Sequence, residues 1–219
     1  SLGYTIGSIC CIDVPSFTEL ELIGSITLQN NINKSMIGNK NQDSSYDQYI
    51  TIKGGIWDGN KDQNINSDGF HFGRTGAGTN HHYKFLDIKL RNIDEDALSL
   101  SYFNQSWINR VYCNGVDGYG FKLTWWSDSI INDCLMSGTD KPNFYLKGGS
   151  NLVSNLYCGG SAWDAEGLGQ VSLQYVKDTV FSNIIVDAMQ EHGIRLYNDG
   201  ESPCERIDFT NFRVSGLDV

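Results

Sequence analysis

Six segments of the chain repeat one pattern of apolar positions. Each segment begins with an apolar residue and carries apolar residues again at its fourth and sixth positions. Their first residues lie 23, 23, 22, 28 and 28 residues apart. Apolar residues at every second position are typical of a β-strand, and no long stretch has the 3.6-residue period of a helix. The segments are FLDIKLRN from Phe85, INRVYCNG from Ile108, INDCLMSG from Ile131, VSNLYCGG from Val153, FSNIIVDA from Phe181 and FTNFRVSG from Phe209.

A second set of strands is expected between these segments. Each of its members is marked by two apolar residues that flank one other residue, and the pairs recur 28, 23, 23, 27 and 23 residues apart. The pairs are Phe70/Phe72, Leu98/Leu100, Phe121/Leu123, Phe144/Leu146, Val171/Leu173 and Ile194/Leu196.

Short strands that recur about every 23 residues at two offsets indicate a solenoid. We therefore predict an all-β fold, a right-handed single-stranded parallel β-helix of about 7–8 turns, in which residues 1–219 form a single domain. A β-sandwich would have strands every 8–12 residues without matching columns between repeats. Because no polar capping segment is evident at either end, we expect the chain to be a fragment of a longer one.

Composition narrows the function classes. The chain has 219 residues and a formal net charge of −10, which argues against a nucleic-acid partner because such a partner needs a basic face. No apolar run approaches the 18 residues of a membrane-spanning helix, so no membrane partner is expected. The 24 glycines and three prolines are typical of many tight turns between short strands.

The six cysteines contain no CxxC pair, which makes a zinc site unexpected. Cys113 and Cys158 share one inward column but lie two turns apart, at roughly 9.6 Å, too far for a disulfide. Cys134 occupies the other inward column, so all three are expected to be buried thiols. The pairing of the others, Cys10, Cys11 and Cys204, stays open.

Residues between the apolar pairs of the second strand set must point outward, because side chains alternate along a strand. This outward column contains His71, Ser99, Lys122, Tyr145, Ser172 and Arg195. Two residues before the first two pairs come Asp68 and Asp96, with Glu95 beside the latter. Stacked strands would bring Asp68 and Asp96 to about 4.8 Å at their Cα atoms. Carboxylates at such spacing can share acid and base roles in glycosidic cleavage, although an aspartate at a turn also commonly bonds backbone amides.

Further side chains along the same sheet are candidates for glycan binding. Lys122, Lys147 and Arg195 supply positive charge, and Trp125 and Trp126 supply faces on which sugar rings could stack. Two longer turns adjoin the sheet, residues 73–84 with His81 and His82, and residues 162–170 with Asp164 and Glu166. Long loops on solenoids often bear function, but an inert histidine pair or a plain loop explains them equally well.

At these residues the chain resembles the pectin-lyase-like β-helix superfamily, and within it the polygalacturonase family of glycoside hydrolases. NSDG at residues 66–69 is similar to the family's N-T-D-G, and EDALSL at residues 95–100 is similar to its D-D-C-I-A-I. The resemblance implies that Asp68 and Asp96 activate water and that Glu95, where the family has Asp, protonates the leaving oxygen. ITIKGGIWDGN at residues 50–60 resembles a recurring turn of β-helix enzymes and of viral tailspike depolymerases.

The resemblance also implies substrate contacts and has departures. Asn66 and His71 would lie beside the acids, and Lys147 would match the lysine of the family's R-I-K motif, which holds a substrate carboxylate. Tyr145 replaces the arginine of that motif, and Tyr119 replaces the histidine of the family's G-H-G motif. These changes put ordinary galacturonan hydrolysis in question.

We therefore expect a polysaccharide-degrading enzyme, a glycoside hydrolase acting on an acidic, uronate-containing glycan. The alternatives are a polysaccharide lyase, in which Tyr119 or a lysine takes the proton, a uronate epimerase, and a non-catalytic tailspike or adhesin module that binds glycan. A homotrimer is one expected assembly, and the expected location is extracellular or on a virion surface. No cofactor and no metal ligand is expected, although the acidic residues permit calcium.

Overall fold

The computed structural model describes residues 10–40, 47–73, 79–160, 169–187, 192–198 and 203–216. These residues form 20 strands of one continuous sheet and a single short 3₁₀-helix, η1 (Lys61–Gln63). No helix within these ranges is long and apolar enough to span a membrane. The first ten strands are β1 (Cys10–Val14), β2 (Glu19–Glu21), β3 (Ser25–Thr27), β4 (Ser35–Asn39), β5 (Thr51–Lys53), β6 (Ile56–Asp58), β7 (Phe70–Phe72), β8 (Asn80–His81), β9 (Lys84–Leu86) and β10 (Lys89–Ile93). The remaining ten are β11 (Leu98–Asn104), β12 (Trp107–Asn109), β13 (Tyr112–Val116), β14 (Phe121–Ser127), β15 (Ile130–Thr139), β16 (Phe144–Gly149), β17 (Leu152–Gly159), β18 (Val171–Asp187), β19 (Ile194–Tyr197) and β20 (Glu205–Ser215).

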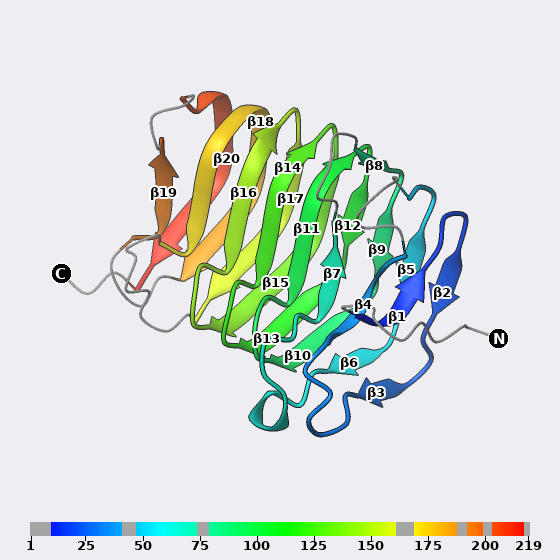
Figure 1. Cartoon of the computed structure of the whole chain (residues 1–219). Coiled ribbons are helices and arrows are strands. Elements are labelled where there is room, and N and C mark those ends of the chain that lie inside the picture. The colour runs from blue at the N-terminus through cyan, green and yellow to red at the C-terminus, as the bar shows by residue number, and fades with distance from the viewer. Residues whose placement is uncertain are drawn as a thin grey trace.

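Every pairing between these strands is parallel, and each strand pairs with the equivalent strand of the next turn. The first column of the repeat is in register through Phe85, Ile108, Ile131, Val153, Phe181 and Phe209. The column from Leu90 through Cys113, Met136 and Cys158 is in register as well. The chain is thus a parallel β-helix of about seven turns, which confirms the predicted fold (Figure 1).

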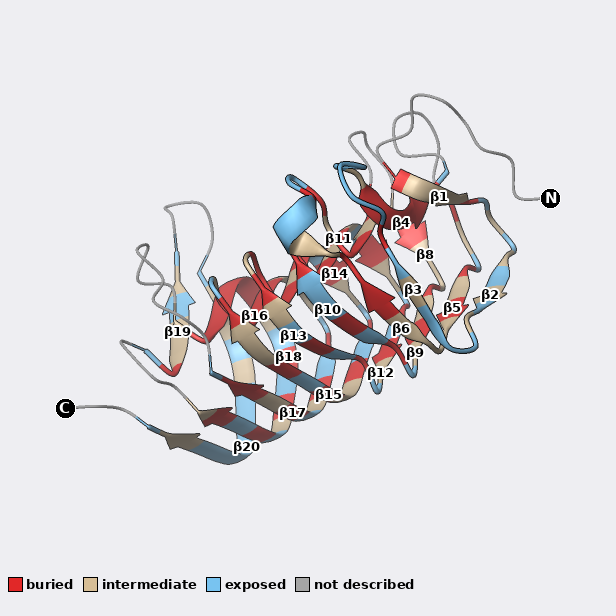
Figure 2. Cartoon of the chain, turned by 90° about the horizontal axis from the view of Figure 1, so that it is seen from below, coloured by how far each residue is buried: buried red, intermediate tan, exposed pale blue. Residues whose placement is uncertain are grey.

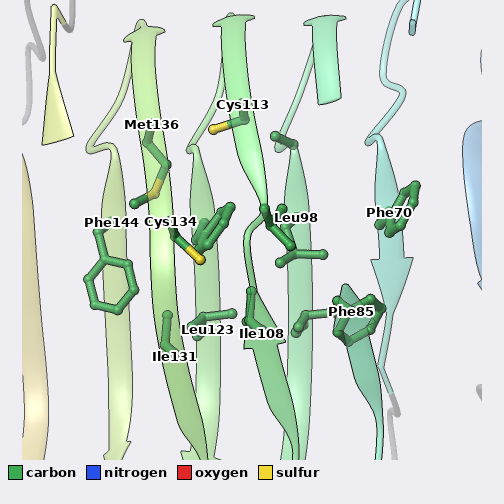
Figure 3. Close-up of a cluster of buried hydrophobic side chains, with 14 of the residues drawn as sticks. Phe70, Phe85, Leu98, Ile108, Cys113, Leu123, Ile131, Cys134, Met136 and Phe144 are labelled. Atoms are coloured by element: carbon green, nitrogen blue, oxygen red, sulfur yellow. The ribbon is translucent and has the colours of Figure 1, made fainter. Parts of the chain in front are cut away.

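The interior of the coil is filled by the residues that the apolar pattern predicted to face inward. Phe70, Leu98, Phe121, Phe144 and Val171 stack in register and have no exposed surface. Buried and exposed residues alternate along the strands (Figure 2), and side chains from different strands meet in the interior (Figure 3). The burial of these side chains holds the turns together, because removing apolar surface from water is the main favourable term.

All six cysteines are free thiols. Cys113, Cys134 and Cys158 are buried, as their columns predicted, and burial raises the pKa of Cys134 to about 12. They pack in the core as small apolar side chains.

Corners of the coil require the left-handed backbone conformation, which asparagine adopts more readily than most residues. Asn155, Asn183 and Asn211 occupy one such corner with φ of 52°, 55° and 51°. Their amides also form a ladder, since Asn183 Nδ2 donates to Asn155 Oδ1 at 2.9 Å and Asn211 Nδ2 donates to Asn183 Oδ1 at 3.0 Å. Asparagine at this corner therefore serves the architecture.

Candidate active site

The candidate site lies on the outer face of the part of the coil formed by β7, β11, β14, β16, the first residues of β18, and β19, which we call the site sheet. The outward column predicted from the sequence is in register from His71 through Ser99, Lys122, Tyr145 and Ser172 to Arg195. Each turn of the coil thus contributes one side chain of this column.

Asp68 and Asp96 join successive turns through one carboxylate oxygen each. Asp68 Oδ1 accepts a hydrogen bond from the backbone N–H of Asp96 at 2.9 Å. Asp96 Oδ1 accepts one from the backbone N–H of Tyr119 at 3.1 Å. The architectural role that aspartates often have at turns is therefore present here, because these bonds satisfy amides at the start of the strands.

The second oxygen of each carboxylate contacts a basic side chain. Asp68 Oδ2 lies 2.5 Å from His71 Nδ1, and Asp96 Oδ2 lies 3.1 Å from Lys122 Nζ. The Asp96 side chain is 6% exposed and the Asp68 side chain 14% exposed, so both carboxylates are largely screened from water, whereas the His71 and Lys122 side chains are 35% and 41% exposed. Asp96 is therefore more enclosed than we expected for a residue that activates bulk water. The sequence did not indicate this enclosure.

Burial and like charge shift both neighbouring acids in the same direction. Burial raises the pKa of Glu95, and the Asp96 carboxylate raises it further, while the Lys141 ammonium opposes the shift. Burial also raises the pKa of Asp96, with Asp68 adding to the rise and Lys122 opposing it. Glu95 is half-buried, so it is the member of the pair that a ligand can approach. A carboxyl group with a raised pKa is suited to donate a proton.

Tyr119 lies against two lysines. Its ring centroid is 5.1 Å from Lys122 Nζ and 5.6 Å from Lys141 Nζ, both within cation–π range. Tyr145 meets the Tyr119 ring edge-on at 5.6 Å, and the Tyr145 hydroxyl donates to Gln174 Oε1. Asp68, Glu95 and Asp96 thus lie beside His71, Lys122, Lys141 and Tyr119. We call these seven residues the acid cluster.

Several residues expected at the site lie elsewhere. Lys147 Nζ is 4.4 Å from the ring centroids of both Trp125 and Tyr175. The acids lie at the start of the strands of the site sheet, whereas Lys147 lies further along its strand. Arg195 is three turns beyond Lys122 in the outward column, and its guanidinium lies 5.5 Å from the Tyr197 ring centroid. Neither cation is brought together with the acids.

Trp126 must be removed from the predicted binding residues. It has no exposed surface and stacks on Phe103 inside the coil, with ring centroids 5.2 Å apart. Trp125 has φ of 55°, a left-handed conformation that interrupts the alternation of side chains. The interruption turns Trp125 outward and sends Trp126 into the core.

The other predicted positions have mixed outcomes. The exposed Asn66 donates its backbone N–H to Asp94 Oδ2 at 2.6 Å, next to the acid cluster. His82 stacks on Tyr49 with ring centroids 4.6 Å apart, beside His81 at a corner of the coil. Asp164 and Glu166 lie outside the described residues.

Lys141 and two aromatic residues, Tyr102 and Tyr175, were not among the site residues predicted from the sequence. Lys141 shares a column with Glu95, two turns further on, and that column was a usable signal. Tyr102, Trp125 and Tyr175 each follow the first apolar residue of a strand by four positions, a second usable signal. In the described part of the chain, no group of three or more His, Cys, Asp or Glu residues could hold a metal ion.

Comparison with known proteins identifies the architecture. No family model and no curated protein matches the chain. The A-module of the mannuronan C-5 epimerase AlgE4 from Azotobacter vinelandii is similar in structure, with a TM-score of 0.53, 11% identity, and coverage of 95% of this chain and 83% of that chain. This likeness supports the pectin-lyase-like parallel β-helix fold that the sequence resemblance implied.

Two further solved structures are more distant. The A-module of the epimerase AlgE6 from the same organism has a TM-score of 0.45 at 12% identity, covering 94% of this chain and 84% of that chain. A candidate glycosyl hydrolase from Parabacteroides merdae has a TM-score of 0.27 at 10% identity, covering 90% of this chain and 82% of that chain.

Proposed function

We propose that this protein is an enzyme acting on a uronate-containing polysaccharide and that its reaction is glycoside hydrolysis. One observation carries the proposal: Asp68, Glu95 and Asp96 stand on two neighbouring turns of an outer face, with basic side chains beside them. The fold-level neighbour AlgE4 is, by its name, a mannuronan epimerase, which accords with a uronate polymer as substrate.

Glu95 is the proton donor of the proposed reaction. Burial and the Asp96 carboxylate raise its pKa, so it holds its proton to a higher pH than an ordinary glutamate. Because Glu95 is half-buried, its carboxyl group can still reach a glycosidic oxygen at the surface. Protonation of that oxygen makes it a better leaving group.

His71 with Asp68 is the base of the reaction. When Asp68 Oδ2 accepts the proton on His71 Nδ1, the lone pair of the imidazole is on Nε2. The side chain of His71 is 35% exposed, so Nε2 can accept a proton from a water molecule. Asp96 acts indirectly, since it holds Lys122 at 3.1 Å.

The cations give the substrate preference. Lys122 and Lys141 flank the Tyr119 ring, and the Lys122 side chain is 41% exposed. An ammonium group next to the reacting ring favours a sugar that carries a carboxylate. Neutral polymers would leave both lysines without this contact.

The same residues favour a second reaction on the same substrate, removal of the proton next to the uronate carboxylate. The observation behind it is the juxtaposition of a carboxylate-held imidazole with two ammonium groups, which would supply a base and neutralise the carboxylate. Elimination would then give a lyase, and return of the proton to the other face would give an epimerase.

One experiment separates these reactions. The purified chain is incubated in D₂O with polygalacturonate, polymannuronate and polyguluronate. New reducing ends without ultraviolet absorbance support hydrolysis, an absorbing unsaturated end indicates elimination, and deuterium at C5 without shortening indicates epimerisation. Glu95→Gln should lower hydrolysis by roughly 10²–10⁴-fold, whereas Lys89→Gln, an exposed change on another part of the coil, should have no effect.

The non-catalytic alternative is tested in the same assay. If the wild-type protein and Asp96→Ala both leave all three polymers unchanged, the enzyme proposal is wrong. Binding without any change in the polymer would then support a glycan-binding module of the tailspike or adhesin kind. A secreted or virion-surface location is compatible with either function, because a protein in such a location can meet extracellular polysaccharides. This location stays a prediction.

That the reaction needs no metal also stays a prediction. We expect the reaction to continue in the presence of a chelator, since the proposed acid and base need no metal. Loss of activity with the chelator and its recovery with added calcium would show that a bound cation is required.

A further inference from the structure

The corner of the coil that follows the site sheet carries a column of residues in the left-handed conformation. These residues have φ between 48° and 59°, and we call them the corner column. Its members stack from turn to turn, because the backbone N–H of His82 donates to Asn104 O and that of Gln105 donates to Ser127 O. The members are Phe17, Tyr49, His82, Gln105, Asp128, Ser150, Asp178 and Arg206.

Both ends of the corner column are occupied by contacts among its own side chains. At one end Phe17 stacks on Tyr49 with ring centroids 5.4 Å apart, and Tyr49 stacks on His82 at 4.6 Å. At the other end Arg206 Nη2 donates to Asp178 Oδ2 at 2.8 Å. These side chains therefore already have partners within the column.

The middle of the corner column has no such contacts. The side chains of Gln105 and Asp128 form no hydrogen bond or ion pair with any residue that the structure describes. Both residues are exposed. A carboxylate accepts hydrogen bonds, and a primary amide both donates and accepts them. These two side chains can therefore bind the hydroxyl groups of a ligand.

A cleft of about 390 Å³ lies beside the middle of the corner column. Four corner residues on successive turns line it, so it extends roughly 14 Å along the coil. Its volume lies within the range of about 300–1,000 Å³ that is typical of small-ligand sites. Residues of the adjoining strands β9 and β12 line it as well. The lining residues that bear on its chemistry are Tyr49, His82, Gln105, Asp128, Lys84 and Trp107.

The cleft also presents aromatic surface. Tyr49 is 49% exposed and Trp107 is 44% exposed, although both side chains are large and largely apolar. Exposed aromatic side chains next to planar polar groups are suited to a sugar. The C–H groups of the sugar contact the aromatic surface, and its hydroxyl groups bond the polar side chains. The composition of the cleft therefore favours a carbohydrate ligand.

Lys84 supplies positive charge to the cleft. Its Nζ lies 4.6 Å from the Trp107 ring centroid, and among the described residues no carboxylate pairs with it. An ammonium group in this position can bind the carboxylate of a uronate. Asp128 is two turns away, roughly 9.6 Å along the coil, which is about one Debye length in 0.1 M salt. The negative charge of Asp128 is therefore largely screened from a carboxylate bound at Lys84.

We propose that this cleft, which we call the corner cleft, is a second glycan-binding site. It binds a uronate oligosaccharide with a carboxylate on Lys84 and hydroxyl groups on Asp128 and Gln105. The inference rests on the proposed function in one respect, that a uronate glycan is the ligand of this protein. Lys122 and Asp128 are six positions apart, at most roughly 20 Å along the chain, so the corner cleft is separate from the acid cluster. A polymer held there has a raised effective concentration at the acid cluster.

Calorimetry with short ligands tests the corner cleft directly. Trisaccharides of galacturonate, mannuronate and guluronate are titrated into Glu95→Gln, which prevents turnover. Adding Lys84→Met, which removes the charge and keeps the length of the side chain, should weaken binding at the corner cleft about tenfold, so that one bound trisaccharide is lost. Adding Asp128→Asn should do the same, and asparagine suits the left-handed backbone there.

Two matched controls lie outside the corner cleft. Asp208→Asn changes an exposed aspartate in the same outward column as Trp107, four turns further on. Lys89→Met changes an exposed lysine on β10. Both should bind as many trisaccharides as Glu95→Gln alone, and with the same affinity. Circular dichroism confirms that each variant is folded.

Kinetics test the role of the corner cleft in the reaction. With Glu95 intact, Lys84→Met should raise KM for a long polymer about fivefold or more and leave kcat unchanged, because it removes binding that does not act on the reacting bond. The same variant should degrade a trisaccharide at the wild-type rate.

The outcomes separate this inference from the proposed function. Unchanged number and affinity of bound trisaccharides in both cleft variants, or no binding by Glu95→Gln, overturns the inference. Hydrolysis by a wild-type protein that gives this result leaves the proposed function standing. Loss of a bound trisaccharide in Lys84→Met, together with a wild type that changes no polymer, overturns the proposed function and supports the corner cleft.

Discussion

The carboxylates of Asp68 and Asp96 each make two kinds of contact. One oxygen accepts a backbone N–H of the next turn, and the other meets His71 or Lys122. Removal of either side chain would therefore leave a buried amide and a basic group without partners, at a cost of about 1–3 kcal/mol. Glu95 lacks such bonds to the next turn, so its substitution tests chemistry with less effect on stability.

The raised pKa of Glu95 predicts a pH-dependent stability difference. In the window between the ordinary glutamate pKa and the raised folded value, the folded state binds more protons than the unfolded state, so stability falls as pH rises. Glu95→Gln removes this term. Its stability relative to wild type should therefore increase as pH rises through the window, and the difference should disappear at lower pH.

Urea denaturation across this pH range measures the difference. Gln105→Ala, an exposed change that removes no titratable group, is the control and should show no such trend. A Glu95→Gln curve parallel to that of the wild type at every pH would contradict the assignment of a raised pKa.

The two neighbouring tryptophans predict opposite results on stability. Trp126→Ala should cost about 3–5 kcal/mol, because it leaves a large cavity in the core. Trp125→Ala should cost less than about 1 kcal/mol, since the side chain is exposed. Chemical denaturation of both variants checks this, and equal losses would mean that Trp125 is buried in the core as Trp126 is.

At the scale of the strands, the repeat was predictable because inward residues must be apolar on every turn. The columns through Phe85 and Leu90 therefore follow from the sequence alone. The orientation of Trp125 and Trp126 did not follow, because a left-handed residue inserted in a strand reverses the alternation and leaves no mark in the apolar pattern. The acids were predictable as neighbours, but the enclosure of Asp96 by Lys122 was not, since it depends on rotamers.

Close stacking of the turns predicts different tolerance at the two ends of β7. A Cβ at Gly69 would lie 2.6 Å from the backbone oxygen of Ala97, whereas one at Gly73 would meet Ser101 Cβ at 3.4 Å. Gly69→Ala should therefore destabilise the fold by about 1–3 kcal/mol, and Gly73→Ala should be near neutral. Thermal or urea unfolding of the pair tests the spacing, and a neutral Gly69→Ala would show that adjacent turns can separate.

At the scale of the molecule, apolar side chains also stack on the outside. Trp107, Ile130, Leu152 and Val180 form one outward column and are 38–44% exposed. Tyr112 on β13 and, further along β15, β17 and β18, Leu135, Tyr157 and Ile185 form another. The two columns flank the corner that carries Asn155 and Asn183, and exposed apolar residues stacked in columns are typical of an interface between subunits.

We propose that these two columns face each other in a homotrimer. Light scattering of the wild-type chain should then give three times the monomer mass, and Ile130→Lys with Leu135→Lys should give the monomer. Gln105→Lys, at an exposed corner, is the control and should keep the trimer. A monomeric wild type at micromolar concentration would contradict the proposal.

The division of labour among the acids has a practical consequence. Both aspartates accept hydrogen bonds that join successive turns of the coil, whereas Glu95 accepts no such bond. A laboratory that wants a durable, inert reagent for tracing uronate polymers should therefore alter Glu95 alone. Changing an aspartate would risk destabilising the coil itself, and the reagent would lose its affinity for the polymer along with its activity.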